Sequence, residues 1–170
     1  MKQLSLVLCA ALLVAGCAQS PFGRGGAADT ADIGAGATGI APGSVSDPTS
    51  VAYFRQSVGD RVLFLVDQST LTPEARAVLS AQAQWLQQNP QYAVTIEGHA
   101  DEQGTREYNL ALGARRAAAA QEFLVSQGIA STRVNTVSYG KERPLEICSE
   151  EACYAQNRRA VTVLASGAGV

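Results

Sequence analysis

The sequence predicts an α/β (α+β) two-layer sandwich, with helices packed on one face of a four-stranded mixed sheet. Two observations support this fold class. Short apolar or alternating runs, typical of strands, are separated by longer segments with helical periodicity. Glycine, proline and asparagine stand at the boundaries between these segments. The predicted order is strand, helix, strand, helix, strand, loop, strand.

The first three elements have clear local signals. The apolar run at 62–66 predicts a well-buried strand. The next helix is predicted to begin with Pro73 at its first position and to end at Asn89. Residues 92–97 alternate, with apolar side chains at every second position, and predict the second strand.

The later elements follow the same pattern. A second helical region covers about 106–127 and ends at Gly128, since glycine is favoured after a helix C-terminus. Strands are predicted at 134–139 and 159–165. Two aromatic side chains in the helical patterns, Trp85 and Phe123, are expected to lie in or beside the core.

Gly113 lies inside the second predicted helix, where a glycine costs about 1 kcal/mol relative to alanine. We therefore predict a break, with a first turn at about 105–111 and a restart with Gly113 near the N-cap, where glycine is tolerated. Arg116 would then lie in the first turn of the main helix. Free backbone N–H groups and the positive end of the helix dipole would make that turn attractive to carboxylates.

The N-terminal segment is expected to lie outside the fold. Residues 1–16 read as a signal peptide, because the apolar run at 4–14 is shorter than the roughly 20 residues needed to span a bilayer. Residues 13–17, Leu-Val-Ala-Gly-Cys, resemble a bacterial lipoprotein cleavage box. This resemblance implies acyl chains on Cys17 that anchor the protein in a membrane. The alternative is an ordinary secretory signal that contains a cysteine.

The mature chain divides into two parts. Residues 17–50 are rich in glycine and alanine with few bulky apolar side chains, so they read as a lipidated N-terminus and flexible tether. A cleaved or idle segment is the alternative reading. Residues 51–170 form the predicted globular domain. Ala18, rather than aspartate, follows the lipidation site, which implies the outer membrane with the domain facing the periplasm.

Of the four cysteines, Cys9 leaves with the signal peptide and Cys17 takes the lipid. Cys148 and Cys153 remain, and an oxidising periplasm predicts a disulfide between them. The alternative is half of a metal site, but the chain has a single histidine, His99, far away in sequence. We predict no metal and no cofactor.

The formal net charge of −2 and the scattered arginines argue against a nucleic-acid partner. Catalysis is also not expected, because no serine or cysteine nucleophile has a visible base partner. His99, Asp101 and Glu102 could imitate a hydrolase cluster, so an enzyme of cell-wall remodelling is kept as a weak alternative.

The most informative segment joins the second strand to the second helix. Asp101 follows the strand and Arg116 lies 15 positions later on the helix. If the turn folds against the helix, one acidic and one basic group face the same space. Such a pair suits a small zwitterion, although an ordinary surface ion pair worth about 0–1 kcal/mol is the simpler reading.

This segment resembles the OmpA-like peptidoglycan-binding domain family. The pattern is an aspartate, a glycine three positions on, an asparagine five further, then a leucine, a small residue and Arg-Ala. Here it is met by Asp101, Gly104, Asn109, Leu112, Gly113, Arg116 and Ala117. Segments 97–102, 138–142 and 156–161 also fit family patterns. Two features depart from the family: 64–67 reads Phe-Leu-Val-Asp instead of Phe-Asp-x-Asp, and most relatives lack the late cysteine pair.

The resemblance implies non-covalent binding of the peptide stem of peptidoglycan through its diaminopimelate residue. Arg116 would bind a carboxylate and Asp101 the ammonium. Asn109 would position the turn or donate to the stem, and Gly104 belongs to the same turn. Tyr139 and Arg159 are further candidate members of the site.

The resemblance also implies partners. One reading is a cell-wall tether of the Tol system that binds a TolB-type propeller protein and supports outer-membrane constriction during cell division. The other is a generic OmpA-like lipoprotein that binds the wall without a Tol partner. In both readings the outer membrane is contacted through the acyl chains on Cys17.

Overall fold

The computed structural model describes residues 41–166. The signal peptide 1–16, the lipidation site Cys17 and most of the predicted tether lie outside this range. Within it, no helix is both long and apolar enough to cross a membrane.

The sheet has four strands in the order β1-β4-β2-β3. Strand β4 lies antiparallel to both β1 and β2, and β2 pairs in parallel with β3. This confirms the predicted mixed sheet. The bounds are β1 Arg61–Leu63, β2 Tyr92–His99, β3 Val134–Gly140 and β4 Arg159–Ser166.

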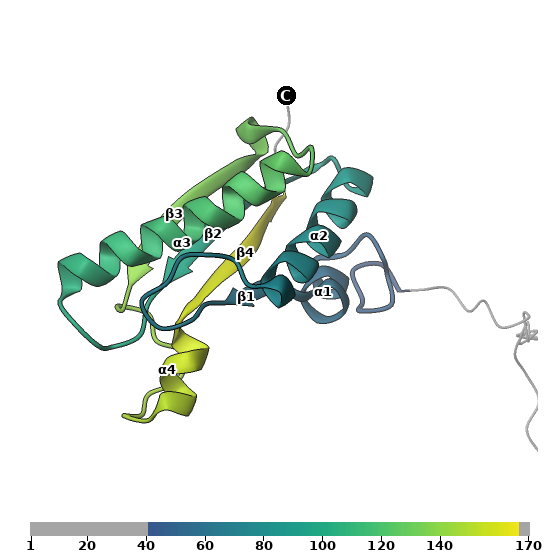
Figure 1. Ribbon diagram of the computed structural model, residues 1–170. Coiled ribbons are helices and arrows are strands. Elements are labelled where there is room, and N and C mark those ends of the chain that lie inside the picture. The colour runs from purple at the N-terminus through teal and green to yellow at the C-terminus, as the bar shows by residue number, and fades with distance from the viewer. Residues whose placement is uncertain (1–40, 167–170) are drawn as a thin grey trace, which may run out of the picture. The chain divides into compact units, whose positions relative to one another are not determined.

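Two long helices cover one face of this sheet (Figure 1). They are α2, Pro73–Gln88, and α3, Arg106–Ser126. Thr72 caps α2 through its side chain, and Pro73 occupies the first turn as predicted. The shorter helical segments are α1 Val51–Tyr53, the π-helical η1 Phe54–Gly59, the 3₁₀ turn η2 Ser131–Arg133 and α4 Glu151–Asn157.

The core lies between the two long helices and the sheet. Trp85 of α2 is at its centre, with its ring centroid 4.9 Å from that of Phe54 and 5.2 Å from that of Tyr92. Trp85 is buried and Phe123 packs against the core half-buried, which confirms both predictions. Burying such aromatic side chains is a main source of folding free energy.

Residues 41–50 already contact this domain. Trp85 Nε1 donates to Pro48 O at 2.7 Å, and Tyr92 Oη donates to Thr49 O at 3.1 Å. Ser50 caps α1, since its Oγ accepts from Tyr53 N. The chain therefore enters the domain beside the first residue of β2.

The predicted first strand is too long. Residues 62–66 were expected to form it, but β1 ends at Leu63, and Leu65 and Val66 are 56% and 55% exposed. Phe64 still points into the core. The chain leaves the sheet there and turns at Asp67, whose φ of 57° lies in the left-handed region.

The predicted break at Gly113 is wrong. Helix α3 runs without interruption from Arg106, with Thr105 as N-cap, so Arg116 lies about three turns inside it rather than in a first turn. Gly113 is there for a different reason, namely that α3 crosses Gly98 of β2 at very short range. A Cβ on Gly98 would lie 1.9 Å from Gly113 O, and one on Gly113 would lie 2.5 Å from Ser138 Oγ. The two glycines permit this close approach.

Candidate ligand pocket

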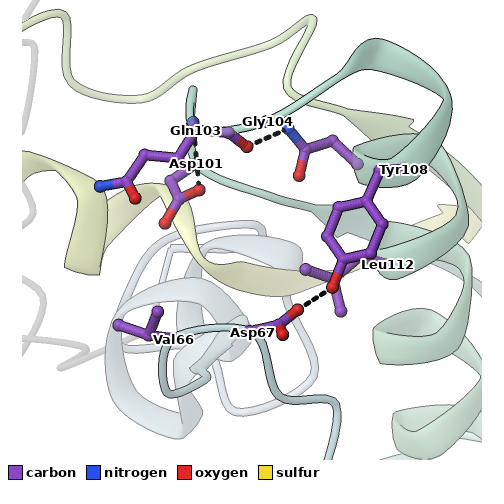
Figure 2. Close-up of a pocket in the computed structure, with 8 residues that line it drawn as sticks. Val66, Asp67, Asp101, Gln103, Gly104, Tyr108 and Leu112 are labelled. Atoms are coloured by element: carbon purple, nitrogen blue, oxygen red, sulfur yellow. Dashed lines mark hydrogen bonds between the residues drawn. The ribbon is translucent and has the colours of Figure 1, made fainter.

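A pocket of about 270 Å³ opens where β2 ends (Figure 2). Three segments form its walls: the loop after β1, the turn after β2 and the first turns of α3. Its lining residues are Val66, Asp67, Asp101, Gln103, Gly104, Tyr108, Asn109 and Leu112. Three of the predicted site residues, Asp101, Gly104 and Asn109, thus lie together.

Hydrogen bonds fix the turn after β2. Asp101 Oδ1 accepts from Gln103 N at 3.3 Å, and the Asn109 side chain donates to Gln103 O at 2.7 Å. Gly104 has a φ of +88°, which a residue with a side chain rarely adopts. Asn109 is buried, so the structure gives it the turn-positioning role that was one of its two predicted roles.

The loop after β1 supplies a second acid to the pocket. Tyr108 Oη donates to Asp67 Oδ1 across the pocket, and Tyr108 remains partly exposed. In Figure 2, Asp67 and Asp101 enter the pocket from separate loops. Two carboxylates on different walls of one small pocket favour a cationic ligand group.

Asp101 and Arg116 were expected to face the same space, with a direct ion pair as the alternative, but no ion pair joins them among residues 41–166. The partner of Asp101 is Arg158, whose Nη1 lies 3.1 Å from Asp101 Oδ2. Both side chains are nearly buried, with 10% and 5% of their surface exposed. Burial by itself would lower the pKa of Arg158, but its hydrogen bonds to the carboxylates of Glu151 and Asp101 outweigh this effect and raise that pKa.

Arg116 is fully buried and does not line the pocket. Its guanidinium donates to His99 O and Gln68 O, each at 2.8 Å, and to Leu65 O at 3.2 Å. It therefore ties α3 to the end of β2 and to the loop that carries Asp67. Burial lowers the pKa of Arg116 to about 10, although the nearby Asp101 partly offsets the effect, so the group stays charged at neutral pH.

Tyr139 and Arg159 lie outside this pocket. The Tyr139 ring is 3.6 Å from the Arg143 guanidinium and 5.6 Å from the His99 ring. Arg159 is buried and donates to Asn157 O and Arg143 O. The structure therefore does not bring these two candidates to the ligand pocket.

His99 is buried between these groups rather than placed for catalysis. Neither ring nitrogen has a hydrogen-bond partner in the described part of the chain, and the nearest acid, Glu97, is 3.8 Å away. Burial, with the positive charges of Arg159 and Arg143, lowers the pKa of His99 to about 4. The ring is therefore neutral at physiological pH.

Comparisons with known proteins identify the family. The sequence profile of the OmpA family matches residues 63–158. The chain belongs to the OmpA family. It is 55% identical to a peptidoglycan-associated lipoprotein of Mesorhizobium japonicum, over 96% of this chain and 92% of the relative. It is 51% identical to the protein of the same name from Brucella melitensis, over 98% and 93%.

A crystal structure of the peptidoglycan-associated lipoprotein from Burkholderia pseudomallei has the same fold. Its TM-score is 0.63 at 38% identity, and the match covers 71% of this chain and 98% of that one. Membership of the OmpA family agrees with the prediction that the chain is not an enzyme. Among residues 41–166, no group of His, Cys, Asp and Glu side chains is arranged to hold a metal ion.

Sequence reasoning missed two residues that line the pocket, Asp67 and Tyr108, and one that binds its acid Asp101, namely Arg158. Asp67 had a signal, because it is the acid that remains where the family pattern has two. Arg158 had none, since nothing local shows that residues 57 positions apart meet.

Proposed function

We propose that this chain is an outer-membrane lipoprotein that binds peptidoglycan non-covalently, through the diaminopimelate of the stem peptide, in the pocket at Asp101. The single observation that carries the proposal is the pocket itself, a space of about 270 Å³ with the carboxylates of Asp67 and Asp101 on its walls. The relatives named peptidoglycan-associated lipoprotein support it.

Diaminopimelate carries an ammonium and a carboxylate at its side-chain end. The pocket supplies acids for the ammonium, and the buried Arg116 next to it would supply a cation for the carboxylate. Asp101 binds the ammonium, and Asp67 lies on the facing loop. Arg116 is the cation for the carboxylate. Its bond to Leu65 O is the longest of its three hydrogen bonds, and the exposed Leu65 lies on a loop outside the sheet. A ligand carboxylate would replace that carbonyl.

The finer role is part of the same proposal. The protein would join the outer membrane to the wall through acyl chains on Cys17, act with a TolB-type propeller protein and support membrane constriction at division. Co-purification of that propeller with the tagged lipoprotein tests this role. Its absence from the purified material would favour the alternative, a wall-binding lipoprotein without a Tol partner.

The binding proposal is tested by co-sedimentation of the full-length lipoprotein, in detergent, with isolated sacculi. A hydrogen bond to a charged group contributes about 1.5–3 kcal/mol, so Asp101→Asn should weaken binding roughly tenfold to a hundredfold. Asp67→Asn should weaken binding less, because Asp67 already accepts from Tyr108.

Two controls make this result specific. Glu122→Gln removes an exposed acid on α3 away from the pocket and should leave binding unchanged. Sacculi with lysine in place of diaminopimelate lack the carboxylate and should bind the wild type more weakly. Equal pelleting by wild type and Asp101→Asn, with both proteins folded by circular dichroism, would disprove the site.

A further inference from the structure

The guanidinium of Arg158 joins three separate segments at the base of the pocket. It donates to Asp101 Oδ2 in the turn after β2 and to Glu151 in α4. Its Nε donates to Phe64 O, next to the loop that carries Asp67. Arg158 is the C-cap residue of α4, and only 5% of its side chain is exposed.

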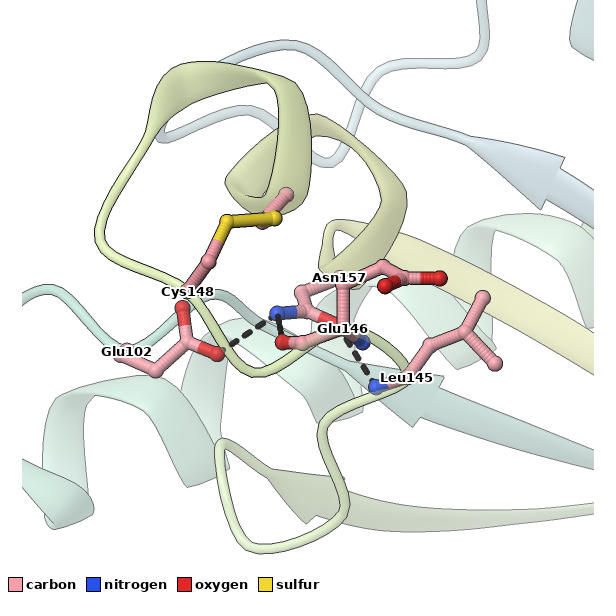
Figure 3. Close-up of a disulfide and its surroundings, with 6 residues drawn as sticks. Glu102, Leu145, Glu146, Cys148 and Asn157 are labelled. Carbon is pink, nitrogen blue, oxygen red and sulfur yellow. Dashed lines mark hydrogen bonds between the residues drawn. A yellow bond between two sulfur atoms is a disulfide. The ribbon is translucent and has the colours of Figure 1, made fainter.

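A second contact connects the same two regions (Figure 3). Asn157, also fully buried, donates from Nδ2 to Glu102 Oε1 at 2.6 Å and to Glu146 O at 2.8 Å. Its Oδ1 accepts from Leu145 N at 2.7 Å. Neighbouring residues at the end of α4 thus contact both acids of the turn, Asp101 and Glu102.

A disulfide closes the segment from which these contacts come. Cys148 and Cys153 are joined, as predicted, with their Cα atoms 6.0 Å apart. Glu151, which accepts from Arg158, lies inside the closed loop and in the first turn of α4. The crosslink therefore restricts the backbone that carries the Arg158 acceptor.

We propose that Arg158 is a positioning residue for the ligand-binding carboxylate of Asp101, and that the Cys148–Cys153 loop holds Arg158 in place through Glu151. The inference rests on the proposed function of the pocket. Arg158 occupies Oδ2 while Gln103 N occupies Oδ1, so both carboxylate oxygens are fixed before a ligand arrives. A preorganised acceptor binds more tightly because less motion is lost on binding.

The first test measures binding of full-length Arg158→Gln to sacculi and, by calorimetry, to a soluble muropeptide that contains diaminopimelate. Binding should weaken roughly tenfold, through loss of one charge-assisted hydrogen bond. Arg158→Lys should recover only part of the affinity, because a single ammonium lacks the planar fork that reaches two acids. Arg55→Gln, at an exposed position, is the matched control and should bind like the wild type.

A double-mutant cycle separates positioning from a general loss of structure. If Arg158 acts through Asp101, adding Arg158→Gln to the Asp101→Asn variant should weaken binding by less than about a further twofold. Fully additive losses would overturn the inference. Asp101→Asn alone tests the proposed function, and unchanged binding by that variant would reject the site. If Asp101→Asn loses binding while Arg158→Gln binds like the wild type, only this inference is rejected.

The loop contribution is tested without removing a buried side chain. Glu151→Gln changes a side chain that is 65% exposed, and Cys148→Ser with Cys153→Ser opens the loop. Each should weaken muropeptide binding roughly threefold, about half of a tenfold loss on the free-energy scale. Reduction of the wild type should match the double serine variant, and Glu122→Gln should change nothing. Wild-type affinity in both loop variants would overturn the role of the loop.

Discussion

An arginine side chain donates to backbone carbonyls at each end of β2, but the surroundings of the two arginines differ. At the amino end, Arg133 donates to Tyr92 O at 2.7 Å and to the carbonyls of Leu86 and Asn89. At the carboxyl end, Arg116 donates to the carbonyls of His99, Gln68 and Leu65. Each arginine thus donates to three backbone carbonyls.

An arginine that donates to three carbonyls therefore stabilises the fold at both ends and does not by itself make a binding site. The neighbours of Arg133 include Tyr92, which packs on Trp85, and the group is half-buried. Arg116 is fully buried, and Asp101 and Asp67 lie near enough to raise its pKa against the effect of burial. The acids and the pocket distinguish the carboxyl end, where ligand binding is proposed.

Replacing each arginine by methionine gives the largest expected contrast. Arg116→Met should lower the free energy of unfolding by about 3–5 kcal/mol, since it removes three hydrogen bonds of a fully buried guanidinium. Arg133→Met should cost only about 1–2 kcal/mol, because water can reach the half-buried site. Urea titration measures both values.

Sacculus binding then separates the two ends. It should fall for Arg116→Met and stay unchanged for Arg133→Met under conditions where both variants are folded. Equal stability losses with equal binding would mean that the two ends do not differ as described.

The buried His99 gives the carboxyl end a pH dependence. The pKa of His99 is lowered to about 4 in the folded state, whereas in the unfolded chain it is near 6.5. Between pH 6.5 and pH 4, only the unfolded chain therefore gains this proton. Stability should therefore fall as pH drops through this window, by on the order of 3 kcal/mol in total.

The measurement is urea unfolding of the wild type and His99→Gln at pH 7.5 and pH 4.5. Lowering the pH should reduce the free energy of unfolding of the wild type more than that of His99→Gln. Taking the difference between the two proteins cancels the contribution of the acids that both contain. A constant difference across the two pH values would contradict the buried neutral ring.

The disulfide is also expected to have only a small effect on stability. Opening the short loop with Cys148→Ser and Cys153→Ser should cost about 2 kcal/mol or less, because the entropy gained by the unfolded chain is small for a short loop. Thermal unfolding with and without reductant measures it. Reductant should destabilise the wild type and leave the serine variant unchanged; the same response in both proteins would contradict this assignment.

Local signals predicted most of the fold. The period-two pattern of β2 and the proline start of α2 depend on neighbouring residues alone, so both were found. The continuity of α3 through Gly113 was missed because its cause is Gly98, which lies in another element. The exposed end of the first apolar run was also missed, since hydrophobicity cannot show that Leu65 and Val66 leave the sheet.

The candidate site was predicted in part for the same reason. Asp101, Gly104 and Asn109 lie within one short segment, whose pattern keeps them together. Arg158 reaches Asp101 only through the arrangement of the sheet and α4, and a seven-residue helix next to a disulfide has little periodicity to show. The direct partner of the predicted acid was therefore visible only in the structure.

The entry of the chain at Pro48 and Thr49 has a mechanical consequence. Thr49 O accepts from the Tyr92 side chain at the amino end of β2, and Pro48 O accepts from Trp85 of α2. Asp101 follows the carboxyl end of β2, roughly 25 Å away for an eight-residue strand. Tension between an anchored N-terminus and a bound wall would run along β2 and load its hydrogen bonds to β3 and β4 together, in shear. Pulling through residues 41 and 101 should therefore require more force than pulling across the sheet through residues 61 and 137. Under the proposed function, a force that separates membrane and wall would therefore load the whole sheet at once.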